Sequence, residues 1–282
     1  MTRLYSLVAG LTILALAALP AQARSDKSKV VERALQQSVR VEVTVRGKVE
    51  RAASGVVIGT EGSTSYVLTN QHVVQRQGLQ GAATFQIVVE RPKLHRVRAR
   101  VVAEGRVPDE DLALLAVEEA LPGVRIAGEG QVDVGDDVVV IGAPYGRSLS
   151  VSAGIVSQLE TDEQDPRVER SMKTDAPIGY GASGGGVFGV PSGRLVGLVE
   201  GYRTAKVAFG GISNDDFSFD VPMPGETFLS PPSRIRGFLI RAGVGKLAGL
   251  RQSGAASAYA SGPSAAGASM AGAPVERPVR RP

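Results

Sequence analysis

A single serine surrounded by glycines is the first feature of the sequence that could do chemistry. Residues 174–188 read TDAPIGYGASGGGVF, in which five glycines flank Ser183. Glycine is costly in regular structure, so this density indicates a backbone that turns tightly or lies open to a ligand. The run also fits G-x-S-x-G, in which the serine hydroxyl is a nucleophile, but the same letters arise in ordinary glycine-rich turns. The pattern therefore points to a nucleophile only if a general base accompanies it.

The two histidines of the chain, His72 and His95, restrict the chemistry open to Ser183. A serine hydroxyl needs a neutral imidazole to take its proton. Both histidines precede the serine, which excludes the Ser-acid-His order of α/β-hydrolases. Asp26 is the only aspartate before His72, and it is too close to the start of the chain to be a good buried acid. The order that remains is His-Asp-Ser.

Local context distinguishes the two histidines. His72 follows a predicted strand at 66–68, where a side chain can face a cleft. His95 lies in the basic polar stretch 93–98, which is typical of a solvated strand face. We therefore predict His72 as the base.

The acid must lie between His72 and Ser183. Asp111 directly precedes the apolar strand 112–117, where a carboxylate can be held beside buried groups. Asp109 and Glu110 are alternatives that we expect to be solvated. The predicted catalytic residues are His72, Asp111 and Ser183.

Short segments with strand periodicity predict an all-β protein. Residues 39–45 alternate apolar and polar side chains, and similar short segments follow between glycines, prolines and aspartates. This pattern is typical of a β-barrel or β-sandwich. We expect short helices at 29–37 and 233–241, the latter capped by Ser233. The predicted strands are 39–45, 55–58, 66–68, 85–89, 97–102, 112–117, 137–141, 151–158, 186–188, 195–200 and 216–221.

Four collinear stretches resemble the trypsin-like protease domain of the HtrA/Deg family of exported bacterial serine proteases, in the chymotrypsin-fold superfamily. The resemblance implies two six-stranded antiparallel β-barrels with the triad in the cleft between them. It places a first barrel at 39–120 and a second barrel with a short closing helix at 121–250, and the N-terminal lead helix predicted from the sequence precedes them at 24–38. The stretches that carry the resemblance are 54–74, 111–115, 134–157 and 174–185.

The same resemblance implies a serine endopeptidase that cleaves peptides or unfolded proteins through an acyl-enzyme. The amides of Gly181 and Ser183 would form its oxyanion hole. Ala176, Pro177 and Ile178 would line an uncharged primary pocket suited to small or medium aliphatic side chains. No cofactor is called for, and two histidines without cysteine make a poor metal site. Two alternatives stay open: a non-catalytic protease-fold module that binds peptides or scaffolds an assembly, and an esterase with the same triad.

Three features depart from the family. Ala182 and Gly186 stand where the family usually has Asn and Pro, and the stretch 202–227 is longer than expected, which makes it a candidate for control of the site. Residues after 232 are too few and too simple in composition for a PDZ domain, so we do not expect PDZ-dependent behaviour.

The two ends differ from the core. Arg3, an apolar run at 7–19 and Ala21-Gln22-Ala23 predict a signal peptide at 1–23, hence an exported protein, periplasmic or secreted, without stable membrane insertion after cleavage. Residues 251–282 are rich in Ala, Gly, Ser and Pro and predict a disordered tail. The ends carry the whole formal net charge of +4, so a nucleic-acid surface is not expected. The absence of cysteine excludes disulfides, and the sequence leaves the oligomeric state open.

Overall fold

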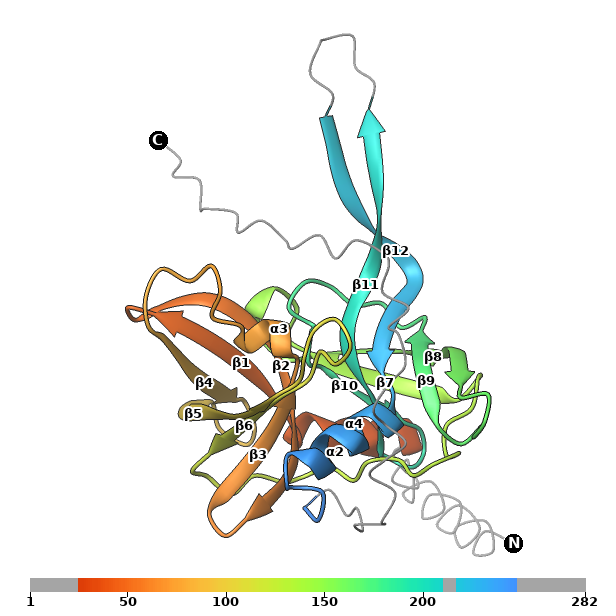
Figure 1. The fold of residues 1–282 in the computed structure, drawn as a ribbon, viewed down its shortest axis with the longest axis horizontal. Coiled ribbons are helices and arrows are strands. Elements are labelled where there is room, and N and C mark those ends of the chain that lie inside the picture. The colour runs from red at the N-terminus through yellow and green to blue at the C-terminus, as the bar shows by residue number, and fades with distance from the viewer. Residues whose placement is uncertain (1–24, 210–216, 248–282) are drawn as a thin grey trace, which may run out of the picture.

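The computed structural model describes residues 25–209 and 217–247, and these form two closed six-stranded barrels with few helices (Figure 1). The predicted signal peptide and the predicted tail lie outside the described residues. The predicted all-β class and the two antiparallel barrels are confirmed. Within the described residues, no helix is long and apolar enough to cross a membrane.

The first barrel closes in the strand order β1-β2-β3-β6-β5-β4. Its inward-facing residues form an apolar cluster that includes Val41, Ile87 and Leu115. The short helix α3 (Gln71–Val74) follows β3 directly. The strands are β1 (Ser38–Val45), β2 (Lys48–Glu61), β3 (Thr64–Thr69), β4 (Ala83–Val89), β5 (His95–Glu104) and β6 (Ala113–Val117).

The second barrel closes in the order β10-β11-β12-β9-β8-β7. Its own apolar cluster includes Val140, Met172 and Ala182. The 3-10 turn η1 (Pro144–Gly146) links β7 to β8. The strands are β7 (Asp137–Gly142), β8 (Ser150–Thr161), β9 (Glu169–Thr174), β10 (Gly186–Gly189), β11 (Leu195–Phe209) and β12 (Phe217–Ser230).

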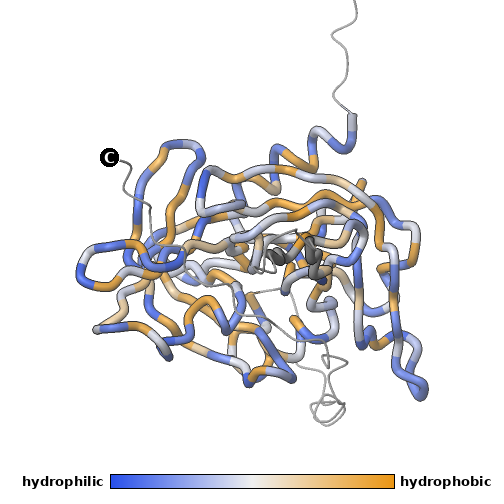
Figure 2. Tube along the Cα trace, turned by 90° about the horizontal axis from the view of Figure 1, so that it is seen from above, coloured by the Kyte–Doolittle hydropathy of each residue, from blue (hydrophilic) through white to orange (hydrophobic). Residues whose placement is uncertain are grey.

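Alternation along the chain explains why these segments form barrel strands. Figure 2 shows hydrophobic and hydrophilic residues alternating along much of the trace, as expected where one strand face packs inward. In β1, however, the polar residues Ser38, Arg40 and Glu42 are buried as well, and only Thr44 is half-buried. Arg40 and Glu42 pair on the outer face, and Arg40 also reaches Glu90. Burial on both faces therefore depends on paired charges.

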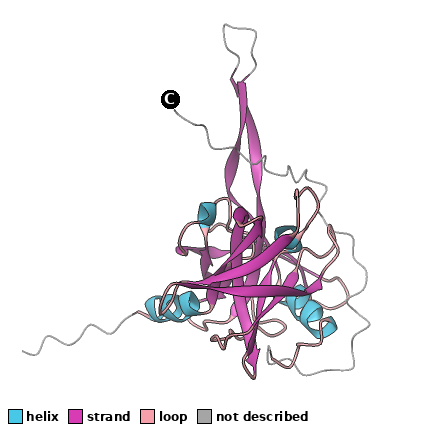
Figure 3. Cartoon of the chain, turned by 90° about the vertical axis from the view of Figure 1, so that its left-hand side faces the viewer, coloured by secondary structure: helices cyan, strands magenta, loops and turns pink. Residues whose placement is uncertain are grey.

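A third apolar cluster joins the barrels to the two longer helices, α2 (Asp26–Gln36) and α4 (Pro232–Arg241). Val30 of α2 and Phe238 of α4 pack with Leu68 from the first barrel and Leu198 from the second. Figure 3 shows both helices against the barrel strands. This shared core fixes the two barrels, and hence the junction between them, as one unit.

The start of α4 differs from the sequence-based expectation. Pro231, not Ser233, is the N-cap residue, and Ser233 is the second residue of the helix. Its hydroxyl donates instead to the backbone carbonyl of Glu169. The cap prediction was wrong because a long-range acceptor takes the hydroxyl and the preceding prolines set the helix start.

The long stretch 202–227 is largely a continuation of two barrel strands. Beyond the barrel, β11 and β12 stay paired from Thr204↔Pro222 to Phe209↔Phe217 and project as a two-stranded ribbon (Figure 1). Residues 210–216 lie outside the described residues. The sequence predicted the strands of this segment to be shorter, because it contains polar and proline positions that interrupt the period.

Candidate active site

The predicted base, His72, and the predicted acid, Asp111, come from the first barrel and are held in a defined orientation. His72 lies on α3, one turn after β3, and Asp111 lies just before β6. The Asp111 carboxylate accepts twice from His72: Oδ2 lies 2.6 Å from Nδ1, and Oδ1 accepts the backbone N–H at 2.9 Å. Asn70 donates to the backbone carbonyl of Asp111 at 2.8 Å, which fixes the acid relative to α3.

The burial of this pair suits proton transfer. Asp111 is only 5% exposed, whereas the His72 side chain is 35% exposed. Since an ionised carboxylate only accepts, Nδ1 carries the proton and Nε2 carries the lone pair. The imidazole can therefore act as a base on the side away from Asp111.

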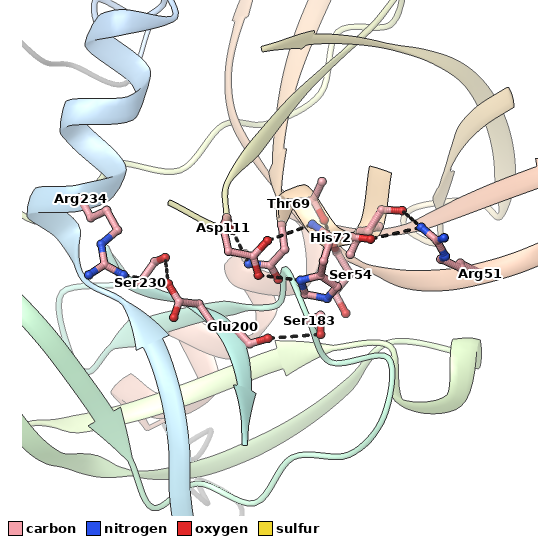
Figure 4. A network of polar contacts seen from close by, with 11 residues as sticks. Arg51, Ser54, Thr69, His72, Asp111, Ser183, Glu200, Ser230 and Arg234 are labelled. Carbon is pink, nitrogen blue, oxygen red and sulfur yellow. Dashed lines mark hydrogen bonds and ion pairs between the residues drawn. The ribbon is translucent and has the colours of Figure 1, made fainter. Parts of the chain in front are cut away.

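The predicted nucleophile, Ser183, belongs to the second barrel. Ser183 lies in the turn before β10, and Figure 4 shows it with the His72–Asp111 pair at the junction of the barrels. Its carbonyl accepts from the backbone N–H of Ser54 in β2 at 2.8 Å, which ties the turn to the first barrel. Its hydroxyl donates a long 3.5 Å bond to the backbone carbonyl of Glu200.

The glycines around Ser183 have a steric reason. Gly181 and Gly184 have φ of +86° and +78°, a conformation that other L-residues rarely adopt. A Cβ on Gly181 would lie 2.7 Å from the Ala143 carbonyl oxygen, and one on Gly184 would collide with Ser54 and Thr69. The turn therefore needs glycine at both positions.

Two amides of this turn point to no protein acceptor within the described residues. The amides of Ala182 and Gly184 donate to Gly179 and Val199 at 3.1 and 2.9 Å. Those of Gly181 and Ser183, which alternate with them, have no such bond among the described residues. An oxyanion hole requires N–H donors that are free to bind a substrate oxygen, and these two amides beside the Ser183 hydroxyl meet that requirement.

The three residues predicted for the primary pocket are not equally accessible. Ala176 is 1% exposed and packs in the core of the second barrel, while its carbonyl accepts from Thr227 at 3.3 Å. Pro177 is exposed and Ile178 is half-buried. Only the latter two offer surface to a ligand in this structure.

Comparison with known proteins defines the family. A model of the trypsin-like peptidase domain matches residues 53–198, which is just over half of the chain. The chain belongs to the trypsin-like peptidase family. Its relatives include a probable DegP-like periplasmic serine endoprotease of Ectopseudomonas mendocina, 32% identical over 219 residues, and one of Pseudomonas putida (strain GB-1), 35% identical over 173 residues. The alignments cover 76% and 60% of this chain, but only 42% and 34% of those proteins.

The fold has a counterpart among solved structures. A structure described as an HtrA-type protease with a tripeptide superposes with a TM-score of 0.58 at 23% identity, covering 78% of this chain and 64% of that one. This likeness shows the fold, while the trypsin-like family model and the DegP-like relatives place the chain among HtrA/Deg-type trypsin-like proteases. The family resemblance seen in the sequence is confirmed.

The other residues weighed from sequence lie elsewhere in the trypsin-like domain. His95 is on β5, where Nε2 lies 2.9 Å from Glu119 and Nδ1 lies 2.8 Å from the Lys93 carbonyl. Asp109 is exposed, and Glu110 forms an ion pair with Arg241 of α4. The structure thus brings Asp111, and neither neighbouring acid, to His72.

Sequence reasoning missed a row of tyrosines beside the glycine turn. The rings of Tyr145 and Tyr180 lie 6.2 Å apart between centroids, and those of Tyr180 and Tyr202 lie 5.6 Å apart, edge to face. Tyr180 directly precedes Gly181, and Tyr202 is two residues beyond Glu200. Burial raises the pKa of the Tyr202 phenol above its usual range, and no partner for its buried hydroxyl is present in the described part of the chain.

Two further residues were missed because no pattern marks them. Arg51 of β2 donates to backbone carbonyls at the end of α3, and the Glu200 carboxylate accepts from Ser230 and from Arg234 of α4 (Figure 4). Single charged residues usually indicate a solvated surface, so the sequence gives no signal for either contact.

Proposed function

We propose that the chain is a serine endopeptidase that cleaves peptide bonds through His72, Asp111 and Ser183. The observation that carries the proposal is that Asp111 accepts two hydrogen bonds from His72, next to Ser183, whose own amide and that of Gly181 have no acceptor among the described residues. This set supplies a base, an orienting acid, a nucleophile and an anion site, which are the parts that acyl transfer requires.

In the proposed reaction, the Ser183 hydroxyl leaves the Glu200 carbonyl and turns to Nε2 of His72. The oxygen attacks the substrate carbonyl carbon while Nε2 takes the proton, and Asp111 stabilises the resulting imidazolium. The carbonyl oxygen becomes an oxyanion that the amides of Gly181 and Ser183 bind. The imidazolium then gives its proton to the leaving amine, and water hydrolyses the acyl-enzyme by the same steps.

An open strand edge supports a peptide substrate. The pairing of β10 with β11 ends at Gly186↔Leu198, so on that side β11 has no strand partner from Glu200 onward within the described residues. An extended peptide can add to such an edge by main-chain hydrogen bonds. The edge passes Ser183, since the Glu200 carbonyl already accepts its hydroxyl. We therefore propose peptides and unfolded proteins as the substrate class.

Export completes the proposal. The DegP-like relatives are named as periplasmic, and the sequence begins with a signal-peptide pattern. We propose that the protein acts in the periplasm or after secretion.

The test compares the protein from Arg24 onward with its Ser183→Ala variant. The parent should react with a serine-directed fluorophosphonate and cleave casein or a peptide library, and Ser183→Ala should do neither. A parent that binds peptides but neither reacts nor cleaves is the non-catalytic module instead. Turnover of esters without any turnover of amides would identify an esterase.

A further inference from the structure

We infer that the β2 segment from Arg51 to Ser54 is a brace that fixes His72 relative to Ser183, with both end residues acting as positioning residues. The inference rests on the proposed function, because it concerns the alignment of the proposed base and nucleophile. Its basis is that one short piece of strand contacts both halves of the site, although those halves belong to different barrels.

At one end of the segment, Arg51 holds the helix that carries the base. Its Nη1 donates to the carbonyls of His72, Val73 and Gln75 at 3.2, 3.3 and 2.6 Å. Helix α3 has only four residues, and its last carbonyls lack partners within the helix. A guanidinium satisfies several such carbonyls at once and complements the negative end of the helix dipole.

At the other end, Ser54 holds the turn that carries the nucleophile. Its N–H donates to the Ser183 carbonyl and its hydroxyl donates to the Gly181 carbonyl, each at 2.8 Å. The same hydroxyl accepts from the backbone N–H of Ala143 at 2.8 Å. Ser54 is 1% exposed, so these bonds are shielded from water.

Between the two ends the segment remains in contact with the second barrel. A Cβ on Gly146 would lie 2.6 Å from Cβ of Ala52, so the backbone of η1 already abuts the strand there. Thr69, three residues before His72, donates to the Ser54 carbonyl at 2.8 Å. The path from base to nucleophile through this strand therefore consists of hydrogen bonds and close packing throughout.

A stiff connection of this kind matters because proton transfer depends on the distance between Nε2 of His72 and Oγ of Ser183. A shift of about 1 Å costs up to roughly a hundredfold in rate. Losing Arg51 frees α3 to move, while Asp111 still holds the imidazole from its other side. The expected defect is thus in reactivity and not in substrate binding.

The first experiment measures the rate of fluorophosphonate labelling of Ser183 in the Arg51→Ala and Arg51→Lys variants. We expect labelling and kcat to fall roughly tenfold or more in Arg51→Ala with KM almost unchanged, and to recover in part with lysine, which keeps the charge but loses the fork. Arg76→Ala is the matched control, because Arg76 lies on the next loop, pairs with Glu104 and should label like the parent. Labelling of Arg51→Ala within twofold of the parent would overturn the brace.

Ser54→Ala tests the other end of the brace. It should slow labelling while Ser65→Ala, which removes another buried hydroxyl of the first barrel, should not. Thermal unfolding of both variants separates a loss of alignment from a loss of fold. Equal rates for the two folded serine variants would contradict the inference.

A second readout does not depend on activity. The His72 proton shared with Asp111 should give a downfield NMR signal in the parent, and Arg51→Ala should shift or broaden it. If the parent is never labelled, the proposed function fails, and this signal alone decides the brace: an unchanged signal in Arg51→Ala overturns it.

Discussion

Ser183 and His72 share one proton in the proposed reaction, so at the scale of single residues they form a unit. We expect Ser183→Ala and His72→Ala each to lower kcat by roughly a thousandfold or more, and the double variant to lose little beyond either one. Both side chains are partly exposed, so the free energy of unfolding should change little. Kinetics on a cleaved peptide, with thermal unfolding as the control, measure this. Near-parental turnover in Ser183→Ala would refute the assignment.

The tyrosine row predicts which residue precedes the cleaved bond. A substrate carbonyl bound by the amides of Gly181 and Ser183 would lie between Tyr180, which precedes Gly181, and the β11 edge at Glu200–Tyr202, whose first carbonyl accepts from Ser183. Because the rings of Tyr180 and Tyr202 meet at 5.6 Å, only small side chains should fit between the two segments. Peptide-library cleavage should therefore occur after small aliphatic residues. Tyr202→Ala should raise kcat/KM for peptides with a larger residue before the cleaved bond about tenfold, relative to kcat/KM for peptides with alanine there. Preferred cleavage by the parent after lysine, arginine or phenylalanine would contradict this.

The pair between His95 and Glu119 makes stability depend on pH. The bond to the Lys93 carbonyl and the pairing with Glu119 raise the pKa of His95. The folded protein thus holds this proton more tightly than the unfolded chain, in which histidine titrates near about 6.5. The resulting stability is fully present below that value and is lost as the pH rises through the folded-state pKa.

Urea unfolding of the parent and His95→Gln measures this effect. The parent's advantage should be larger at about pH 5.5 than at about pH 8.5, because the protonated imidazole gains more from Glu119 than the neutral imidazole does. If the difference in the free energy of unfolding between the parent and His95→Gln is equal or larger at about pH 8.5, the pair does not act through its charge.

At this scale the sequence could predict the candidate triad, but it could not predict the contacts that hold the triad in place. Two histidines and one G-x-S-x-G leave a single triad order by elimination, and local context then favours His72 over His95. Asp111 followed from its place before an apolar strand. Arg51 and Tyr202 could not be found in this way, because their contacts join residues that are far apart in sequence or that pack across a turn with no spacing rule.

At the scale of elements, α4 is connected to the site through a side chain. Arg234 of α4 lies 3.1 Å from the Glu200 carboxylate, which also accepts from Ser230, and the Glu200 carbonyl accepts from Ser183. Removing Arg234 leaves a partly buried carboxylate short of a partner, so the Glu200–Tyr202 edge should loosen.

We therefore expect Arg234→Ala to lower kcat/KM by roughly three- to tenfold, the factor that corresponds to about 1 kcal/mol of lost alignment. Arg241→Ala is the control, since Arg241 lies on the same helix and pairs with Glu110. Peptide kinetics on the two variants measure the difference. Equal effects of both substitutions would indicate a general contribution of helix charge and not a tie to the edge.

Elements were predictable where a period of two ran uninterrupted. The strands around 39–45 and 137–141 lie close to their predicted positions, because alternating or continuous apolar residues mark them clearly. The β11–β12 ribbon was underestimated because its length depends on pairing between the two strands, which a single-strand pattern does not reveal. The predicted N-cap of α4 was wrong for a similar reason, since Ser233 donates to the carbonyl of Glu169, which lies 64 residues earlier in the chain.

At the scale of the whole molecule, helix α2 packs against the apolar cluster that both barrels share. Ser25 caps α2, and Val30 and Ala34 are each 1% exposed in the cluster that joins both barrels. The first helix of the described chain is therefore held in place by its packing against the core. Ala182, the residue before the nucleophile, is 2% exposed among apolar side chains of the second barrel.

These two facts argue against activation by a newly cut chain end that inserts beside the nucleophile. An ammonium group there would meet no carboxylate at position 182, and α2 would have to leave the core to deliver it. Burying such a charge without a partner costs on the order of several kcal/mol. Protein that starts at Arg24 and protein with a few extra N-terminal residues should therefore cleave a peptide at the same rate. If the extended forms are inactive until they are trimmed, the site depends on a free N-terminus and α2 is not the fixed element described above.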